Sequence, residues 1–108
     1  MPSHIPESDW RRFKEVRELL LEHFCVQALS DLAAMARGTE GTAHQRYLRA
    51  WKLIQGRDEE LARAFNDLRR STAVMQLGIM RRMGLLTDED LKLFSEATQK
   101  QIHVIASV

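Results

Sequence analysis

The stretch that decides the predicted fold covers residues 58–83 and reads DEELARAFNDLRRSTAVMQLGIMRRM. Its apolar side chains recur mainly at alternating steps of four and three residues, which aligns them along one face of an α-helix. Beyond residue 72, apolar side chains also cover the other faces of that helix. Carboxylates in the first turn and arginines in the last turn match the helix dipole. We therefore predict one continuous helix over residues 58–83, amphipathic at its start and apolar on nearly every side at its end.

A helix that is apolar on every side must lie inside a bundle or between two chains. Three other helices of the same chain could surround it, and a two-fold interface centred near Gly78 would cover it more easily. Glycine inside a helix costs about 1 kcal/mol relative to alanine, so we expect another segment to pack closely against Gly78. The interface hypothesis assigns the contact to five residues: Val74, Met75, Leu77, Gly78 and Met80.

The rest of the chain predicts three further helices. Both prolines lie within the first six residues, so no proline interrupts a helix afterwards. Capping signals and helical apolar spacing place these helices over residues 8–37, 42–55 and 87–105. The second of them is expected to turn these apolar side chains toward the core: Tyr47, Leu48, Trp51 and Ile54. Alternation typical of strands is absent apart from a weak trace near residues 103–108.

Small and polar residues mark the expected helix ends. Gly38, Gly56 and Gly84 each follow the last residue of a predicted helix, where glycine commonly acts as the C-cap. Thr42, with Gln45 three residues later, fits a capping box at a helix start. The short link after Gly56 favours neighbouring helices that run antiparallel.

These expectations combine into one fold class. We predict an all-α protein, a four-helix bundle-like domain whose first and third helices are long. Residues 1–7 should form an extended N-terminal arm, because each proline disfavours helical backbone at the residue before it. Residues 8–108 should form a single helical domain, in keeping with a chain of 108 residues.

Composition predicts a soluble, cytoplasmic protein. The formal net charge is +1, so no strong overall field attracts nucleic acid or an anionic membrane. The single cysteine, Cys25, lies in an apolar run and suggests a buried, reduced thiol. The longest apolar run, residues 19–26, is interrupted by Glu22 and His23 and is too short to span a membrane. The first residues lack the apolar segment of a secretory signal.

The sequence offers no constellation for catalysis or for a metal. No glutamate precedes a histidine by three residues, the spacing of di-metal helical bundles. The four histidines fall in separate segments, and no glycine-rich loop follows a strand to hold phosphate. We therefore expect neither enzymatic activity nor a cofactor or metal ion.

Nucleic-acid binding is the strongest alternative from another functional class. Residues 81–87 resemble the turn of a helix-turn-helix, but the next helix would begin with three carboxylates, which repel DNA. The predicted second helix offers a basic face instead, which could contact phosphates through four residues: Arg46, Arg49, Lys52 and Arg57. A solvated polar face explains the same pattern.

The favoured function is therefore a small helical protein-interaction module. It would form a homodimer, or act as an adaptor for another protein, through the predicted third helix. The alternative is a nucleic-acid-associated regulator that uses the basic face of the second helix. Solution mass and titration with DNA at two salt concentrations distinguish the two hypotheses.

Overall fold

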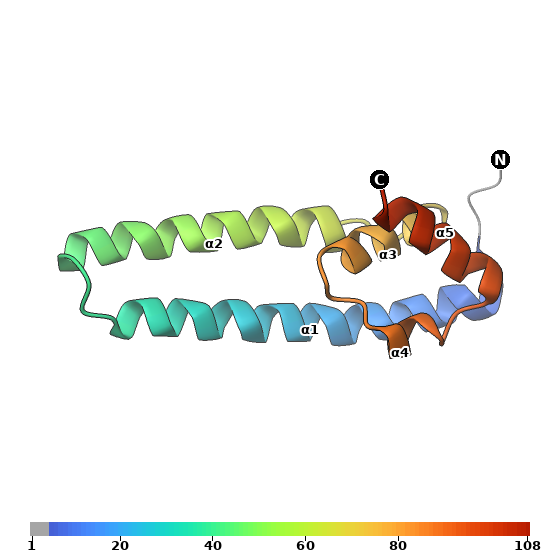
Figure 1. The fold of residues 1–108 in the computed structure, drawn as a ribbon, viewed down its shortest axis with the longest axis horizontal. Coiled ribbons are helices and arrows are strands. Elements are labelled where there is room, and N and C mark those ends of the chain that lie inside the picture. Colours follow the sequence, from blue (N-terminus) through green and yellow to red (C-terminus); the bar gives the residue numbers. More distant parts are fainter. Residues whose placement is uncertain (1–4) are drawn as a thin grey trace.

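The computed structural model describes residues 5–108. Over this range the chain is all-α, as predicted, and the elements follow one another around a long hairpin (Figure 1). The elements are α1 (Glu7–Arg37), α2 (Ala43–Phe65), the 3₁₀ turn η1 (Arg70–Thr72), α3 (Ala73–Arg82), α4 (Asp88–Leu91) and α5 (Glu96–Ala106). The long helices are thus the first two. The prediction that the third helix is long is wrong, because α3 has only 10 residues.

α1 and α2 form an antiparallel hairpin that sets the length of the molecule, which measures 53 × 24 × 22 Å. At the tip, the Thr42 hydroxyl accepts from the Gln45 N–H and the Gln45 side chain accepts from the Thr42 N–H. The predicted capping box is therefore confirmed. Gly41, just before it, has φ +78°, a conformation that favours glycine.

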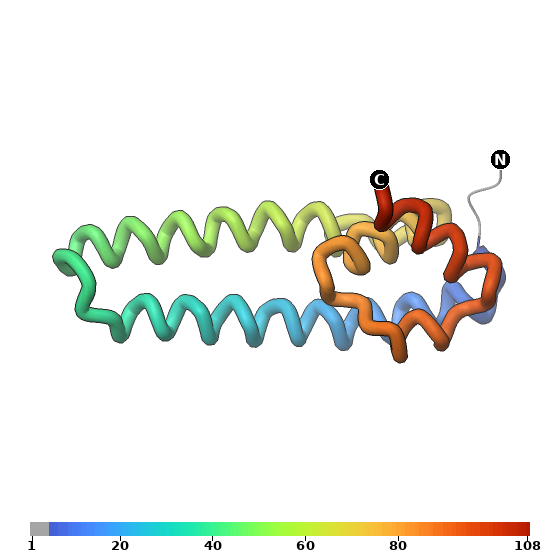
Figure 2. Tube along the Cα trace, in the orientation of Figure 1, coloured from blue at the N-terminus to red at the C-terminus, as the bar shows by residue number. Residues whose placement is uncertain are grey.

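The hydrophobic core lies at one end of this hairpin. There α3 and α5 pack against each other and against the start of α1 and the end of α2, while Figure 2 shows the chain folding back repeatedly at this end alone. The buried residues of this core are Ile5, Phe13, Val16, Leu20, Phe24, Ala64, Phe65, Ala73, Leu77, Met80, Leu86, Phe94 and Ile102.

The predicted start of a helix at Asp58 is wrong because α2 does not end at Gly56. Gly56 keeps a negative φ and lies within the helix, so the carboxylates at residues 58–60 belong to its middle. Glycine lowers helix stability by only about 1 kcal/mol. Continuation of α2 buries Ala64 and Phe65 in the core, which outweighs that cost.

The helix predicted over residues 58–83 is interrupted at residues 66–69, before η1 begins. Asn66 and Asp67 favour such a break because their side chains compete for backbone hydrogen bonds. Carbonyl groups exposed by the break receive side-chain donors: Arg17 donates to the Phe65 carbonyl and Gln76 to the Asp67 carbonyl. The turn lets α3 fold back onto α1 and α2.

The helix predicted over residues 87–105 is also divided into two helices, α4 and α5. Thr87 is the N-cap of α4, as the predicted helix start implies, and it forms a capping box with Asp90. Gly84 lies just beyond the C-cap of α3, as predicted for a helix end, and has φ +80°. However, α4 ends after one turn, and Ser95 caps a new helix by accepting from the Thr98 N–H. The start of α5 at Glu96 leaves Phe94 in the link between α4 and α5, where its side chain is buried in the core.

The predicted N-terminal arm falls partly outside the described residues, which begin at Ile5. Pro6 has extended backbone at φ −55° and ψ 153°, and α1 starts at Glu7. Ile5 is buried, and its carbonyl accepts two hydrogen bonds from the Arg70 guanidinium at 3.0 and 2.7 Å.

Candidate interaction surface

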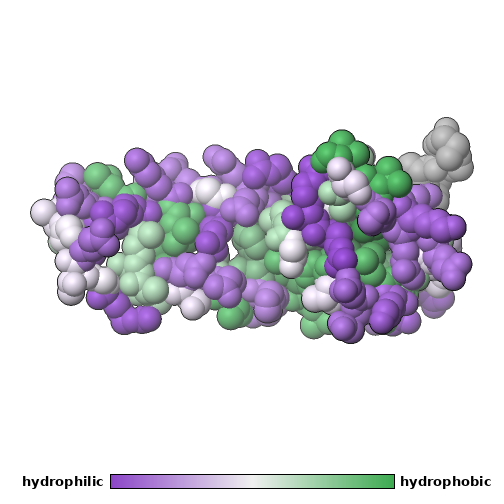
Figure 3. All heavy atoms as spheres, in the orientation of Figure 1, coloured by the Kyte–Doolittle hydropathy of each residue, from purple (hydrophilic) through white to green (hydrophobic). Residues whose placement is uncertain are grey.

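The outer half of the α1–α2 hairpin contains apolar side chains but no core. From Leu29 to Arg63 not one residue is buried, whereas Ala28 and Ala64 on either side are. In this half only α1 and α2 lie side by side, and Figure 3 shows apolar atoms between the charged ones there. The large apolar side chains most exposed in this region are Leu29 (61%), Tyr47 (69%), Leu48 (42%) and Trp51 (57%).

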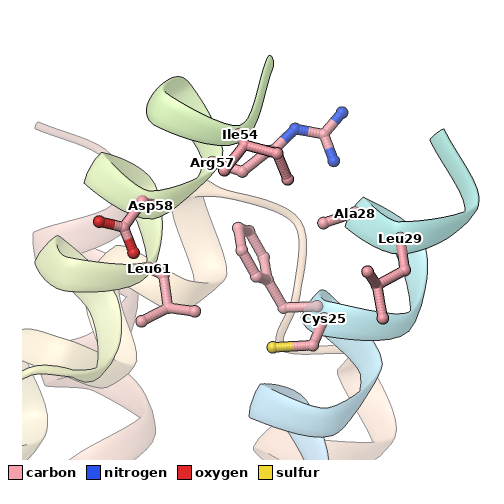
Figure 4. Close-up of a pocket in the computed structure, with 8 residues that line it drawn as sticks. Cys25, Ala28, Leu29, Ile54, Arg57, Asp58 and Leu61 are labelled. Carbon is pink, nitrogen blue, oxygen red and sulfur yellow. The ribbon is translucent and has the colours of Figure 1, made fainter. Parts of the chain in front are cut away.

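Two shallow hollows follow the groove between the two helices. One, of about 240 Å³, lies between Cys25 and Leu29 on α1 and Ile54 and Leu61 on α2 (Figure 4). The other, of about 220 Å³, is lined by Leu32, Tyr47, Ala50, Trp51 and Ile54. Ile54 lines both hollows, so the two form one continuous apolar strip. We call this strip the hairpin face and define it as Cys25, Leu29, Leu32, Tyr47, Trp51, Ile54 and Leu61.

Polar groups on the hairpin are arranged around this strip. Arg57 donates to Asp31 across the two helices at 2.7 Å and approaches Glu60 at 3.9 Å. The hydrogen bonds from Arg57 and then from Gln27 hold the pKa of Asp31 below its ordinary value. In Figure 4 the Asp58 carboxylate points away from α1, which leaves the groove apolar.

The five residues predicted to form an interface do not share one exposed surface. Leu77, Gly78 and Met80 lie in the core, because α5 of the same chain covers α3. A Cβ atom added to Gly78 would clash with the Ile105 side chain, including its Cβ atom at 2.6 Å, so the close packing expected there is confirmed. Of the remaining two, Val74 is half-buried and Met75 is exposed.

Sequence reasoning missed the hairpin face because it placed Tyr47 and Trp51 in the core. Their steps of four and three with Ile54 are the same whether the stripe meets its own chain or another. One available sign was that, once Gly56 is placed inside the second helix, the first helix is the only other long helix, which leaves part of the apolar stripe on the second helix uncovered.

Three of the four arginine and lysine residues proposed to contact nucleic acid are engaged within the chain. Arg46 donates to the Gly41 carbonyl at 2.9 Å and Arg49 to the Glu40 carbonyl at 2.6 Å, while Arg57 pairs with Asp31. Arg46 and Arg49 share one hollow at the hairpin tip with Glu40 and Asp31. Lys52 lies on the exposed surface of α2.

The segment resembling a helix-turn-helix does not form that motif. α4 has only four residues. Arg81, at the end of α3, donates to the Asp88 carboxylate at the start of α4, with a donor–acceptor distance of 2.5 Å. A recognition helix needs several turns to present side chains along the major groove. The acidic first turn of α4 therefore pairs with the end of α3 through Asp88.

Within residues 5–108, no group of three or more His, Cys, Asp and Glu side chains is placed to hold a metal ion. Cys25 is half-buried at the edge of the hairpin face, while His23 and His44 are exposed.

By length and composition, α1 could cross a membrane, and only 17% of its apolar window is buried in the fold. Core helices of soluble proteins meet the same criterion, so this is weak support for a membrane span. The cytoplasmic location inferred from the sequence stays a prediction.

The chain matches no protein-family model, and no curated protein or solved structure is significantly similar to it.

Proposed function

We propose that this chain is a small helical protein-interaction module whose hairpin face binds helices of a protein partner. The observation that carries the proposal is the absence of any buried residue between Leu29 and Arg63, in two helices that bear a continuous apolar strip. The surface differs from the one expected from the sequence, because α3 is covered by α5.

A hairpin whose apolar face is covered by a partner is more stable than one whose apolar face is exposed to water. Helices in proteins gain most of their stability from packing an apolar face, and two helices alone leave much of each face in water. Contiguous apolar patches on a soluble domain commonly mark interaction sites. Tyrosine and tryptophan are enriched in the centres of protein interfaces, and the hairpin face presents one of each, both more than half exposed.

Site-specific photo-crosslinking tests the proposal. A benzophenone side chain in place of Trp51 should capture protein when the chain is irradiated in the cells that produce it, because this position faces the partner. The matched control carries the same group in place of Val104, which is 62% exposed on α5 outside the hairpin face. Equal or lower capture at position 51 than at position 104 would contradict the proposal.

A nucleic-acid-associated regulator is the second candidate, favoured by the proximity of Arg46 and Arg49 at the tip. It has less support because their guanidinium groups already donate to carbonyls of the tip turn. Phosphate contacts through these residues and Lys52 would produce binding that weakens with salt. Titration against duplex and single-stranded DNA at low and high salt tests this, and a lack of binding at low salt eliminates the candidate.

A further inference from the structure

We infer that the partner of the hairpin face is a second copy of this chain, docked antiparallel about a two-fold axis so that two hairpins form a four-helix bundle. This inference rests on the proposed function and specifies its partner. Charge and spacing each support it.

Charge is distributed unevenly along the hairpin. Residues 31–57, which form the tip half of the hairpin, contain two carboxylates, Asp31 and Glu40, and five Arg or Lys residues: Arg37, Arg46, Arg49, Lys52 and Arg57. Nearer the core, residues 15–30 and 58–65 carry two cations, Arg17 and Arg63, and six carboxylates: Glu15, Glu18, Glu22, Asp58, Glu59 and Glu60. An antiparallel pair places the basic tip of each copy beside the acidic region of the other. A parallel pair would bring like charges together, which disfavours it.

Spacing on the hairpin face fits helix-on-helix packing. On α1 the strip steps from Cys25 by four residues to Leu29 and by three to Leu32. On α2 it takes the same steps from Tyr47 to Trp51 and Ile54. Steps of four and three on both helices present a seam suited to knobs-into-holes packing, the arrangement of antiparallel four-helix bundles. This two-chain bundle differs from the single-chain four-helix bundle predicted from the sequence.

Light scattering of the purified chain provides the first test. We expect twice the chain mass at micromolar concentration, and at least a tenfold weaker association for Trp51→Glu and for Tyr47→Glu. Both side chains are largely exposed in the isolated fold, so circular dichroism should show unchanged helicity. Val104→Glu is the matched control and should stay dimeric. A monomeric wild-type chain overturns the inference, as does a dimer that both hairpin-face variants leave intact.

Cysteine cross-linking tests the orientation in a Cys25→Ser background. His44→Cys at the tip and Glu18→Cys near the core should link to each other with a short bismaleimide when the two variants are mixed. Efficient linkage of His44→Cys to itself, without the mixed product, indicates a parallel pair and overturns the inference.

Other partners give distinct outcomes. A purified monomer, together with cross-links from position 51 to a different protein, would overturn the second-copy inference and leave the proposed function standing. A purified monomer that floats with phosphatidylcholine vesicles, and fails to do so as Trp51→Glu, would identify a lipid surface as the partner and overturn both.

Discussion

At the residue scale, the buried carboxylate of Asp9 joins the start of α1 to the start of α5. Its oxygens accept hydrogen bonds from the Ser95 N–H at 2.9 Å and from the Ser95 and Thr98 hydroxyls, each at 2.6 Å. Burial alone would raise the pKa of Asp9, but the hydrogen bonds from Ser95 and Thr98 outweigh it and the pKa lies below its ordinary value. The negative charge also faces the N-terminus of α5, where the helix dipole favours it.

Asp9→Ala should lower the free energy of unfolding by about 3 kcal/mol, because it removes charged hydrogen bonds and leaves buried donors unsatisfied. Urea denaturation followed by circular dichroism measures the loss. The control Glu15→Ala removes a carboxylate that pairs with exposed Arg12 on the surface of α1, and should change stability little. Equal losses in the two variants would contradict a special role for Asp9.

The pH dependence of the wild type supplies a second readout for Asp9. Its pKa is lower in the folded chain than the unfolded value of 3.8, so its contribution is complete above about pH 4 and is lost as the pH falls through the folded pKa. The wild type should therefore lose more stability between pH 6 and pH 3 than Asp9→Ala does. A parallel pH dependence in the two proteins would show that Asp9 does not titrate in this way.

Two glycines provide a matched pair of opposite predictions. Gly78→Ala should destabilise the fold by about 1–3 kcal/mol, since overpacking against Ile105 outweighs the gain in helix propensity. Gly56→Ala should raise stability by about 0.5–1 kcal/mol, because a Cβ there has open space and the residue lies within α2. Thermal and urea unfolding measure both. A stabilising Gly78→Ala would contradict the packing described between α3 and α5.

At the element scale, the two halves of the hairpin differ in what supports them. The inner half packs on α3 and α5, while the outer half is held by the Asp31–Arg57 pair, the capping box and partly covered apolar side chains. Helices with few buried contacts open locally at low free energy.

Hydrogen exchange should therefore reveal two levels of protection in the variant Trp51→Glu, which the proposed dimer predicts to be monomeric. Amides of residues 29–37 and 43–60 should exchange faster than those of α3 and α5, since their hydrogen bonds lack a packed face behind them. In the wild-type chain the proposed dimer should protect the same amides. Mass spectrometry of peptides from both proteins measures this, and uniform protection in the variant would refute the difference between the two halves.

At the scale of the whole molecule, the chain is more extended than a compact domain of its length. Its radius of gyration is 16.6 Å, whereas a compact domain of this size has about 13 Å. The excess comes from the overhanging outer half of the hairpin, which a second copy would flank along its length. The proposed dimer thus accounts for both the elongated shape and the uncovered apolar strip.

The sequence by itself determined the helical class and several helix starts. The caps at Thr42 and Thr87 were predictable because they depend on hydrogen bonds between residues three apart in the chain. Only the tertiary structure decided where α2 ends and which helix covers α3. Those outcomes depend on distant partners, such as Arg17 at the Phe65 carbonyl and Ile105 against Gly78, that local spacing does not encode. For the same reason, periodicity identified the apolar stripe of Tyr47 and Trp51 but not whether its own chain would bury it.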